Sequence, residues 1–419
     1  MAKTALNRSF YYLLGTQTAS NMADILYTMA LTVMVLNQTD SLISATLVPL
    51  IRGAMGMISG SVAPLLMARI KLTRLLFVSQ LGQFVVFSLL VLYLWNRGDS
   101  SVLLPVLLLV SILSFLDGWT TPSRNSLVPR LVGSDSGLMK ANGMLSVSDQ
   151  IVQFAGWGLS GVVVVLIGTR NTMLAAAVIY GLAASLTLRI HEPALEINVG
   201  KKALARSNRN ILIEGWQLIW RVPRLRVLTF MDVSDMIANS VWAGAFLLVY
   251  VQQVLERGDE WWGFINAAYF SGTLLGGIIV VSLVEKLSRR IYSYMLVGMI
   301  GYSLFIYLFA FNQSPWLALL FVVLCGPFAE LAMVSRKTLL QRSLDKARLP
   351  QLFSAQNVLL NLFFCLSLLG MAWIAETFGI VPLFVFAACL TSVTVVIGLL
   401  SYKVFHRAEE TGQESASTL

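Results

Sequence analysis

Six carboxylates lie inside stretches of the sequence that are otherwise apolar, and they are the residues best suited to carry protons or to bind a cation. An aspartate at the centre of a membrane helix costs about 2.5 to 3.5 kcal/mol on insertion scales. A chain that retains several such residues is expected to use them for proton transfer, for ligand binding or for structural ion pairs. The six are Asp24, Asp117, Asp149, Asp232, Asp235 and Glu330.

Several of these carboxylates belong to polar stripes with helical spacing. Gln17, Asn21 and Asp24 follow one another at steps of four and three residues, which places them on one face of a helix. A helix face turned to lipid has no use for polar groups, so such a face is expected to line a cavity or to meet a neighbouring helix. Stripes of this kind occur in four apolar stretches, and the predicted substrate-cavity residues are Gln17, Asn21, Gln150, Gln153, Trp157, Asp232, Asn239, Trp242, Asn357 and Asn361. For the two tryptophans, helix packing is the alternative to stacking on a ligand.

Asp24 is the first candidate for proton coupling, followed by Asp149 and Asp235. Arg52 lies at a similar depth in the next apolar stretch, so an Asp24–Arg52 ion pair is the alternative, and both roles can hold together. Asp117 and Glu330 lie near inner ends, where we expect ion pairs with loop arginines that form a gate or anchor a loop, with direct proton carriage as the alternative. The predicted intramembrane pair or gate comprises Arg52, Asp117, Glu330, Glu285, Arg289, Arg290, Arg69 and Arg74. Pro122 and Pro129 are expected to turn the chain out of its helix, with Arg124 and Arg130 at the inner headgroups.

The sequence offers little for other kinds of chemistry. Cys325, Cys365 and Cys389 fall within apolar stretches without CxxC spacing, so no metal site or cofactor is predicted. "GWGLSG" (156–161) matches a dinucleotide fingerprint by its letters, but it lies inside an apolar stretch rather than after a strand. There, as in "GTLLG" (272–276), small residues are expected to let helices approach closely. A Walker A pattern is missing, so the sequence predicts neither ATP hydrolysis nor an enzyme.

The elements that must position these residues are membrane helices. Hydrophobic residues make up 57% of the 419-residue chain and charged residues 12%, a composition too apolar for a soluble domain. A bilayer core of about 30 Å needs about 20 apolar residues per helix. Twelve runs meet this length, and the predicted fold is an all-α membrane protein with spans at about 10–36, 42–67, 75–95, 102–121, 141–167, 171–189, 227–254, 262–284, 292–311, 315–334, 356–375 and 380–402.

The net charge of +9 reports membrane topology rather than a nucleic-acid partner. If the N-terminus is inside, most lysines and arginines fall in inner segments, while the outer loops hold only Arg97, Arg170 and Arg257. This asymmetry follows the positive-inside rule and predicts that both termini are cytoplasmic.

The chain divides into two halves with repeated segments. "SRNSLVPRLV" (123–132) and "SRKTLLQRSL" (335–344) each leave the fourth span of a half, and the basic connection between the halves is the longest one. Two six-helix bundles in parallel repeat are the plan of alternating-access carriers. The predicted domains are an N-terminal bundle (1–190), a cytoplasmic linker with an interfacial helix (191–226), a C-terminal bundle (227–403) and a disordered cytoplasmic tail (404–419).

Three segments together resemble the major facilitator superfamily, in particular its macrolide-efflux and enterobactin-type siderophore exporter branch. They are "RSFYYLLGTQTASNMAD", "FLDGWTTPSRNSLVPRLV" with the following "LMKANGMLS", and "EGWQLIWRVPRLRVL". The resemblance implies the major facilitator fold, a monomer in the bacterial inner membrane, and export of a bulky amphipathic molecule in exchange for protons. Two departures are Ala68, where the family usually has an acidic residue, and Gly156-Trp157, where the antiporter signature has Gly-Pro.

The sequence therefore leaves three candidate functions. The first is a secondary active exporter of a drug, macrolide or siderophore type of molecule, driven by proton antiport, with protons and membrane lipids as further partners. The alternative is a proton-independent facilitator or lysophospholipid-type translocator, which the missing Gly-Pro favours. A receptor or scaffold without transport is the third, and the lack of a sizeable soluble domain argues against it.

Overall fold

The computed structural model describes residues 6–39, 42–97, 103–193, 208–242, 244–258, 260–403 and 405. Within these residues all regular secondary structure is helical, which confirms the predicted all-α fold. The tail predicted to be disordered (404–419) lies outside the described residues apart from Phe405, as does most of the linker before residue 208. The helices are α1 (Arg8–Thr39), α2 (Leu42–Arg69), α3 (Leu72–Arg97), α4 (Leu103–Asp117), α5 (Thr120–Leu131), α6 (Asp135–Thr187), α8 (Asn208–Arg221), α9 (Pro223–Asn239), η2 (Ser240–Trp242), α10 (Gly244–Gln253), α11 (Glu260–Ser282), α12 (Val284–Arg289), α13 (Ile291–Ala310), α14 (Pro315–Arg342), α15 (Leu349–Phe378) and α16 (Ile380–Leu400).

The helices are long and apolar enough for a polytopic membrane protein. Among the described residues, 9 helices could cross a membrane by length and composition, or 10 if the bent pair Pro223–Trp242 and Phe246–Gln253 forms one span. Two other predicted spans, 10–36 and 141–167, are helical but are not among these candidates. Both belong to helices that carry polar stripes.

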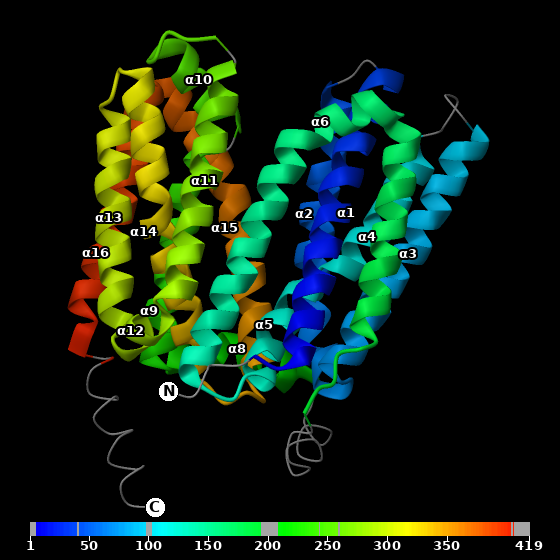
Figure 1. Cartoon of the computed structure of the whole chain (residues 1–419), viewed down its shortest axis with the longest axis horizontal. Helices are drawn as coiled ribbons and strands as arrows, with labels where there is room; N and C mark the ends of the chain where they lie inside the picture. The colour runs from blue at the N-terminus through cyan, green and yellow to red at the C-terminus, as the bar shows by residue number, and fades with distance from the viewer. Residues whose placement is uncertain are drawn as a thin grey trace, which may run out of the picture. The chain divides into compact units, whose positions relative to one another are not determined.

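The chain folds into two units, each with its own packed interior. Unit 1 comprises Met1–Ala141, Ser148–Gly215 and Asp345–Val358, and unit 2 comprises Asn142–Val147, Trp216–Leu344 and Leu359–Leu419. In unit 1, α2 packs on α1 and α4, and α4 packs on α3 (Figure 1). The core of unit 1 gathers Tyr27, Phe87 and Tyr180 from α1, α3 and α6, with the Phe87 ring centroid 5.2 Å from that of Tyr27 and 5.6 Å from that of Tyr180. This aromatic core fixes the positions of the polar side chains around it.

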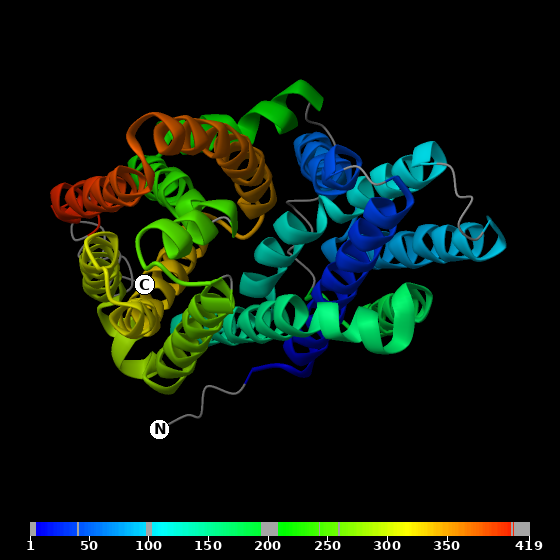
Figure 2. The same ribbon diagram turned by 90° about the horizontal axis from the view of Figure 1, so that it is seen from above.

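In unit 2, α11, α13 and α14 lie side by side, as both views show in light green to yellow (Figures 1 and 2). The packing of α11 on α14 depends on glycines. A Cβ atom on Gly272 would lie 2.3 Å from the carbonyl oxygen of Val323, and one on Gly326 would lie 2.2 Å from the carbonyl carbon of Gly272. Only residues without side chains permit the backbones to approach this closely.

Two backbone breaks differ from simple helix ends. Helix α6 joins two predicted spans and turns back on itself in Figure 1, and its break is at Gly168, with φ of 80° and ψ of 157°. This conformation is essentially restricted to glycine. The other break, at Gly118 and Trp119, separates α4 from α5.

The expectation that Pro122 and Pro129 end the helix is wrong. Both lie within α5, which continues to Leu131. Pro122 is in the first turn of α5, where a backbone N–H has no helical partner, so its missing donor costs no hydrogen bond there. The chain instead breaks its helix before these prolines, where Gly118 packs against Ser59 of α2 and a Cβ atom would lie 2.5 Å from that of Ser59.

The helix expected in the linker is α8. It ends at Arg221, and Pro223 opens α9. Within unit 1, α8 packs closely on the start of α15, since a Cβ atom on Gly215 would lie 2.1 Å from the carbonyl oxygen of Gln351. Ile211 of α8 is also buried. One face of α8 is therefore covered by protein. The proposal that its other face, with the exposed Trp220, lies on the inner leaflet remains a prediction.

Candidate functional site

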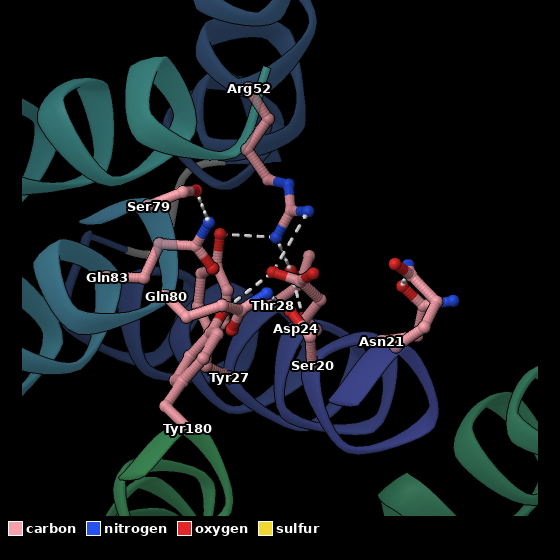
Figure 3. A network of polar contacts seen from close by, with 11 residues as sticks. Ser20, Asn21, Asp24, Tyr27, Thr28, Arg52, Ser79, Gln80, Gln83 and Tyr180 are labelled. Carbon is pink, nitrogen blue, oxygen red and sulfur yellow. Dashed lines mark hydrogen bonds and ion pairs between the residues drawn. The ribbon is translucent and has the colours of Figure 1, made fainter. Parts of the chain in front are cut away.

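The first candidate site surrounds Asp24 near the middle of α1 (Figure 3). Arg52 of α2 forms an ion pair with Asp24 at 3.4 Å, and the Tyr180 hydroxyl of α6 donates a hydrogen bond to the same carboxylate at 2.6 Å. Only 13% of the Asp24 side chain is exposed. The structure therefore brings together Asp24 and Arg52, the pair considered from their equal depth in the sequence.

Neutral groups from α1 hold the other side of the Arg52 guanidinium. It donates to the Tyr27 hydroxyl and, at 2.7 Å, to Thr28 Oγ1, and it lies over the Tyr27 ring at 4.9 Å from the centroid. Arg52 therefore has neutral partners on α1 in addition to its ion pair with Asp24.

A second ion pair, between α5 and α6, is bonded to Asn21, one turn before Asp24 on α1. The Asn21 amide donates to Asp149 of α6 at 2.7 Å, Arg124 of α5 approaches the other Asp149 oxygen at 3.4 Å, and Gln17 donates to Asn21 at 2.6 Å. Three residues of the predicted stripes thus meet in unit 1. Arg124 was expected at the headgroups, and this expectation is wrong because the residue is 7% exposed and paired with Asp149.

Unit 2 contains an arginine held by two aspartates. Arg336 of α14 contacts Asp232 at 2.7 Å and Asp235 at 2.6 Å, both from α9, and only 7% of its side chain is exposed. The sequence predicted roles for both aspartates but none for the arginine. A signal was present, since Ser335-Arg336 and Ser123-Arg124 occupy the same place in the two repeated segments.

The remaining unit 2 stripe residues have uncharged partners. Asn239 accepts a hydrogen bond from the Tyr302 hydroxyl of α13. Trp242 stacks on Tyr269 with centroids 5.9 Å apart and also meets Phe309 and Phe384. Trp242 is therefore part of an aromatic cluster, the packing alternative considered for it.

The two predicted gate carboxylates, Asp117 in unit 1 and Glu330 in unit 2, have different partners. Asp117 interacts with Asp24, Arg52 and Arg124 and with the carboxamide of Gln83. Glu330 is buried and accepts a hydrogen bond from Ser146. Four loop arginines expected to pair with these carboxylates, and Glu285, are exposed instead, and Arg69 donates to Asn208. The four arginines are Arg69, Arg74, Arg289 and Arg290.

The other predicted cavity residues are described mainly by their exposure. Gln150 is half-buried, Gln153 is exposed, and the side chain of Trp157 lies outside the described part of the structure. Asn357 and Asn361 of α15 are half-buried, and the Asn357 amide lies beside Gly60 of α2. Among the described residues, histidine, cysteine and carboxylate side chains form no group of three suited to a metal ion.

An apolar helical fold with buried, paired carboxylates in both units is typical of membrane proteins that move ions or solutes. No family model matches the chain. It is 29% identical to the uncharacterized MFS-type transporter YfmI of Bacillus subtilis over 94% of this chain and 96% of that protein, and 27% identical to YjbB of the same organism over 96% and 98%. The crystal structure of FucP, a major facilitator superfamily transporter in the outward conformation, superposes with a TM-score of 0.74 at 12% identity, covering 93% of this chain and 98% of that one.

The chain thus has the major facilitator fold and is homologous along nearly its whole length to MFS-type transporters of Bacillus subtilis.

Proposed function

We propose that this transporter exports an amphipathic small molecule of the drug, macrolide or siderophore type in exchange for protons, with Asp24 as the coupling residue. The observation that carries the proposal is the Asp24–Arg52 pair, a buried carboxylate beside an arginine that neutral groups also hold. Intramembrane ionisable residues are costly and are retained mainly for such functions.

In this mechanism Asp24 alternates between two states. When ionised, it is neutralised by Arg52 and accepts the hydrogen bond from Tyr180. When protonated, it leaves the charge of Arg52 without its counter-ion, which weakens the binding of a cationic or hydrogen-bond-donating substrate group beside it. Proton binding and substrate binding thereby oppose each other, as exchange requires.

The proton gradient supplies enough energy for useful export. One elementary charge that crosses 100 mV is worth about 2.3 kcal/mol, roughly a fiftyfold concentration ratio. One proton per substrate therefore suffices. The resemblance and the bacterial relatives support a location in the bacterial inner membrane, and the distribution of basic residues supports cytoplasmic termini.

An accumulation assay tests this proposal. An efflux-deficient bacterium expressing the transporter is loaded with a panel of labelled macrolides, dyes and catecholate siderophores, with and without a protonophore. We expect lower accumulation of at least one compound, reversed by the protonophore and by Asp24→Asn. Glu376→Gln is the matched control, since Glu376 is exposed on α15.

Export that persists in the presence of the protonophore would instead support the proton-independent facilitator. In that case the Asp24–Arg52 pair would be structural, and Asp24→Asn would lower the amount of folded protein rather than change the energy source.

A further inference from the structure

Two buried glutamines next to the Asp24 site each have an oxygen without a hydrogen-bond donor. Gln80 and Gln83, on successive turns of α3, are both 0% exposed. Their amide nitrogens donate to Ser20 Oγ at 3.1 Å and to Ser79 Oγ at 2.9 Å, respectively, but neither carboxamide oxygen accepts a hydrogen bond from a described residue. A buried acceptor without a partner costs about 1 to 3 kcal/mol. Two such acceptors on one helix face point to a ligand that donates hydrogen bonds.

The two glutamines lie between two carboxylates. Ser20, which receives the Gln80 hydrogen bond, is one turn before Asp24 on α1. The Gln83 side chain is near enough to act electrostatically on Asp117, the last residue of α4. Figure 3 shows Gln80 bonded to Ser20 and Gln83 bonded to Ser79 beside the Asp24–Arg52 pair. Ser20, Gln80 and Gln83 therefore place polar groups between Asp24 and Asp117 within unit 1, and water would have to bridge the steps from Asp24 to Ser20 and from Gln80 to Gln83.

The charges around this connection favour a mobile proton. Arg52 interacts with both Asp24 and Asp117, while Arg124, the other cation near Asp117, also pairs with Asp149. Two tyrosines, Tyr27 and Tyr180, complete the set of titratable groups beside Asp24. One shared arginine can neutralise one of the two carboxylates at a time, so the other is a site for a proton.

We propose that Gln80 and Gln83 hold water in a proton relay that connects Asp24 to Asp117, with Asp117 as a second protonation site. The inference rests on the proposed function, in which Asp24 carries the proton. In one transfer, the O–H bond of protonated Asp24 breaks and its proton joins a water molecule. That water passes a proton to the Asp117 carboxylate, where a new O–H bond forms. The glutamine oxygens accept hydrogen bonds throughout and are not protonated.

Infrared difference spectroscopy tests the relay without a substrate. The probe is the proton alone, added to or removed from the purified full-length protein in lipid by pH jumps in H₂O and D₂O. We expect two protonated-carboxyl bands, one lost in Asp24→Asn and the other in Asp117→Asn. In Gln83→Leu and in Gln80→Leu, deprotonation of Asp24 should slow by about tenfold, or about 1.4 kcal/mol on the barrier.

Two further variants separate the relay from a packing role. Gln83→Ser removes the same amide but leaves room for another water molecule, so it should keep the wild-type rate. Gln313→Leu replaces an exposed glutamine outside the network and should change nothing.

Wild-type exchange rates in both leucine variants, or the lack of an Asp117 band, would overturn the relay. If the leucine variants do not fold, Asp117→Asn decides, because the relay requires this change to slow proton exchange at Asp24. Lack of the Asp24 band would instead contradict the proposed function. If the Asp24 band titrates and both leucine variants exchange protons at the wild-type rate, the relay is wrong but the proposed function stands.

Discussion

At the scale of single residues, Arg336 is a buried side chain whose ion pairs should stabilise this protein. It is the counter-ion of both Asp232 and Asp235, at 2.7 and 2.6 Å, in a site that is almost closed to solvent. Removing one partner of a buried ion pair leaves charge without compensation and costs about 3 to 5 kcal/mol. We therefore expect Arg336→Met to lower the thermal unfolding midpoint of the purified protein in detergent by several degrees.

A combined variant and a control make this prediction specific. Adding Asp232→Asn and Asp235→Asn to Arg336→Met removes the unpaired charges and should restore most of the midpoint. Arg170→Met changes an exposed arginine and should leave it unchanged. An Arg336→Met protein as stable as the wild type would show that the pair contributes nothing to folding.

Single residues were only partly predictable from the sequence. Depth along two adjacent spans was enough to suggest the Asp24–Arg52 pair, because antiparallel neighbours place residues of equal depth at the same level. The burial of Arg124 could not be predicted in this way, because prolines and arginines after an apolar run are typical of a helix end. Their helix, α5, in fact continues to Leu131.

At the scale of elements, α11 and α14 pack with their backbones close together. Gly272 and Gly326 let these backbones meet, and the small-residue spacing of "GTLLG" predicted such an approach without indicating the partner helix. Overfilling a tight contact costs about 1 to 3 kcal/mol. Gly272→Ala should therefore unfold at lower temperature or denaturant concentration than the wild type.

Gly263→Ala is the matched control for this contact. It lies on the same helix, and a Cβ atom there would meet nothing within 4 Å. Because alanine favours helices over glycine, this variant should be as stable as the wild type or slightly more so. Equal effects of both substitutions would mean that α11 does not depend on the close approach.

At the scale of the whole molecule, the asymmetry of basic residues predicts the topology. We expect an alkaline phosphatase fused after the C-terminus to be inactive and a green fluorescent protein at the same place to fluoresce. The same phosphatase fused after Arg257, in a predicted outer loop, should be active. The reverse pattern would overturn the assignment of cytoplasmic termini.

The all-helical membrane fold could be predicted from the lengths of the apolar runs, because these lengths depend on the bilayer thickness and on many residues at once. The candidate sites depend on a few side chains whose partners come from distant parts of the sequence. Tyr180 reaches Asp24 across 156 positions, and no local pattern encodes that contact.

Proton uptake into proteoliposomes tests the central claim most directly. The purified transporter is reconstituted with a pH-sensitive dye inside, and an outward gradient of a substrate identified by the accumulation assay is applied. The account predicts internal acidification with the wild type and with Glu376→Gln, and no acidification with Asp24→Asn, although substrate still binds. Acidification by Asp24→Asn at the wild-type rate would contradict the role of Asp24 in proton coupling.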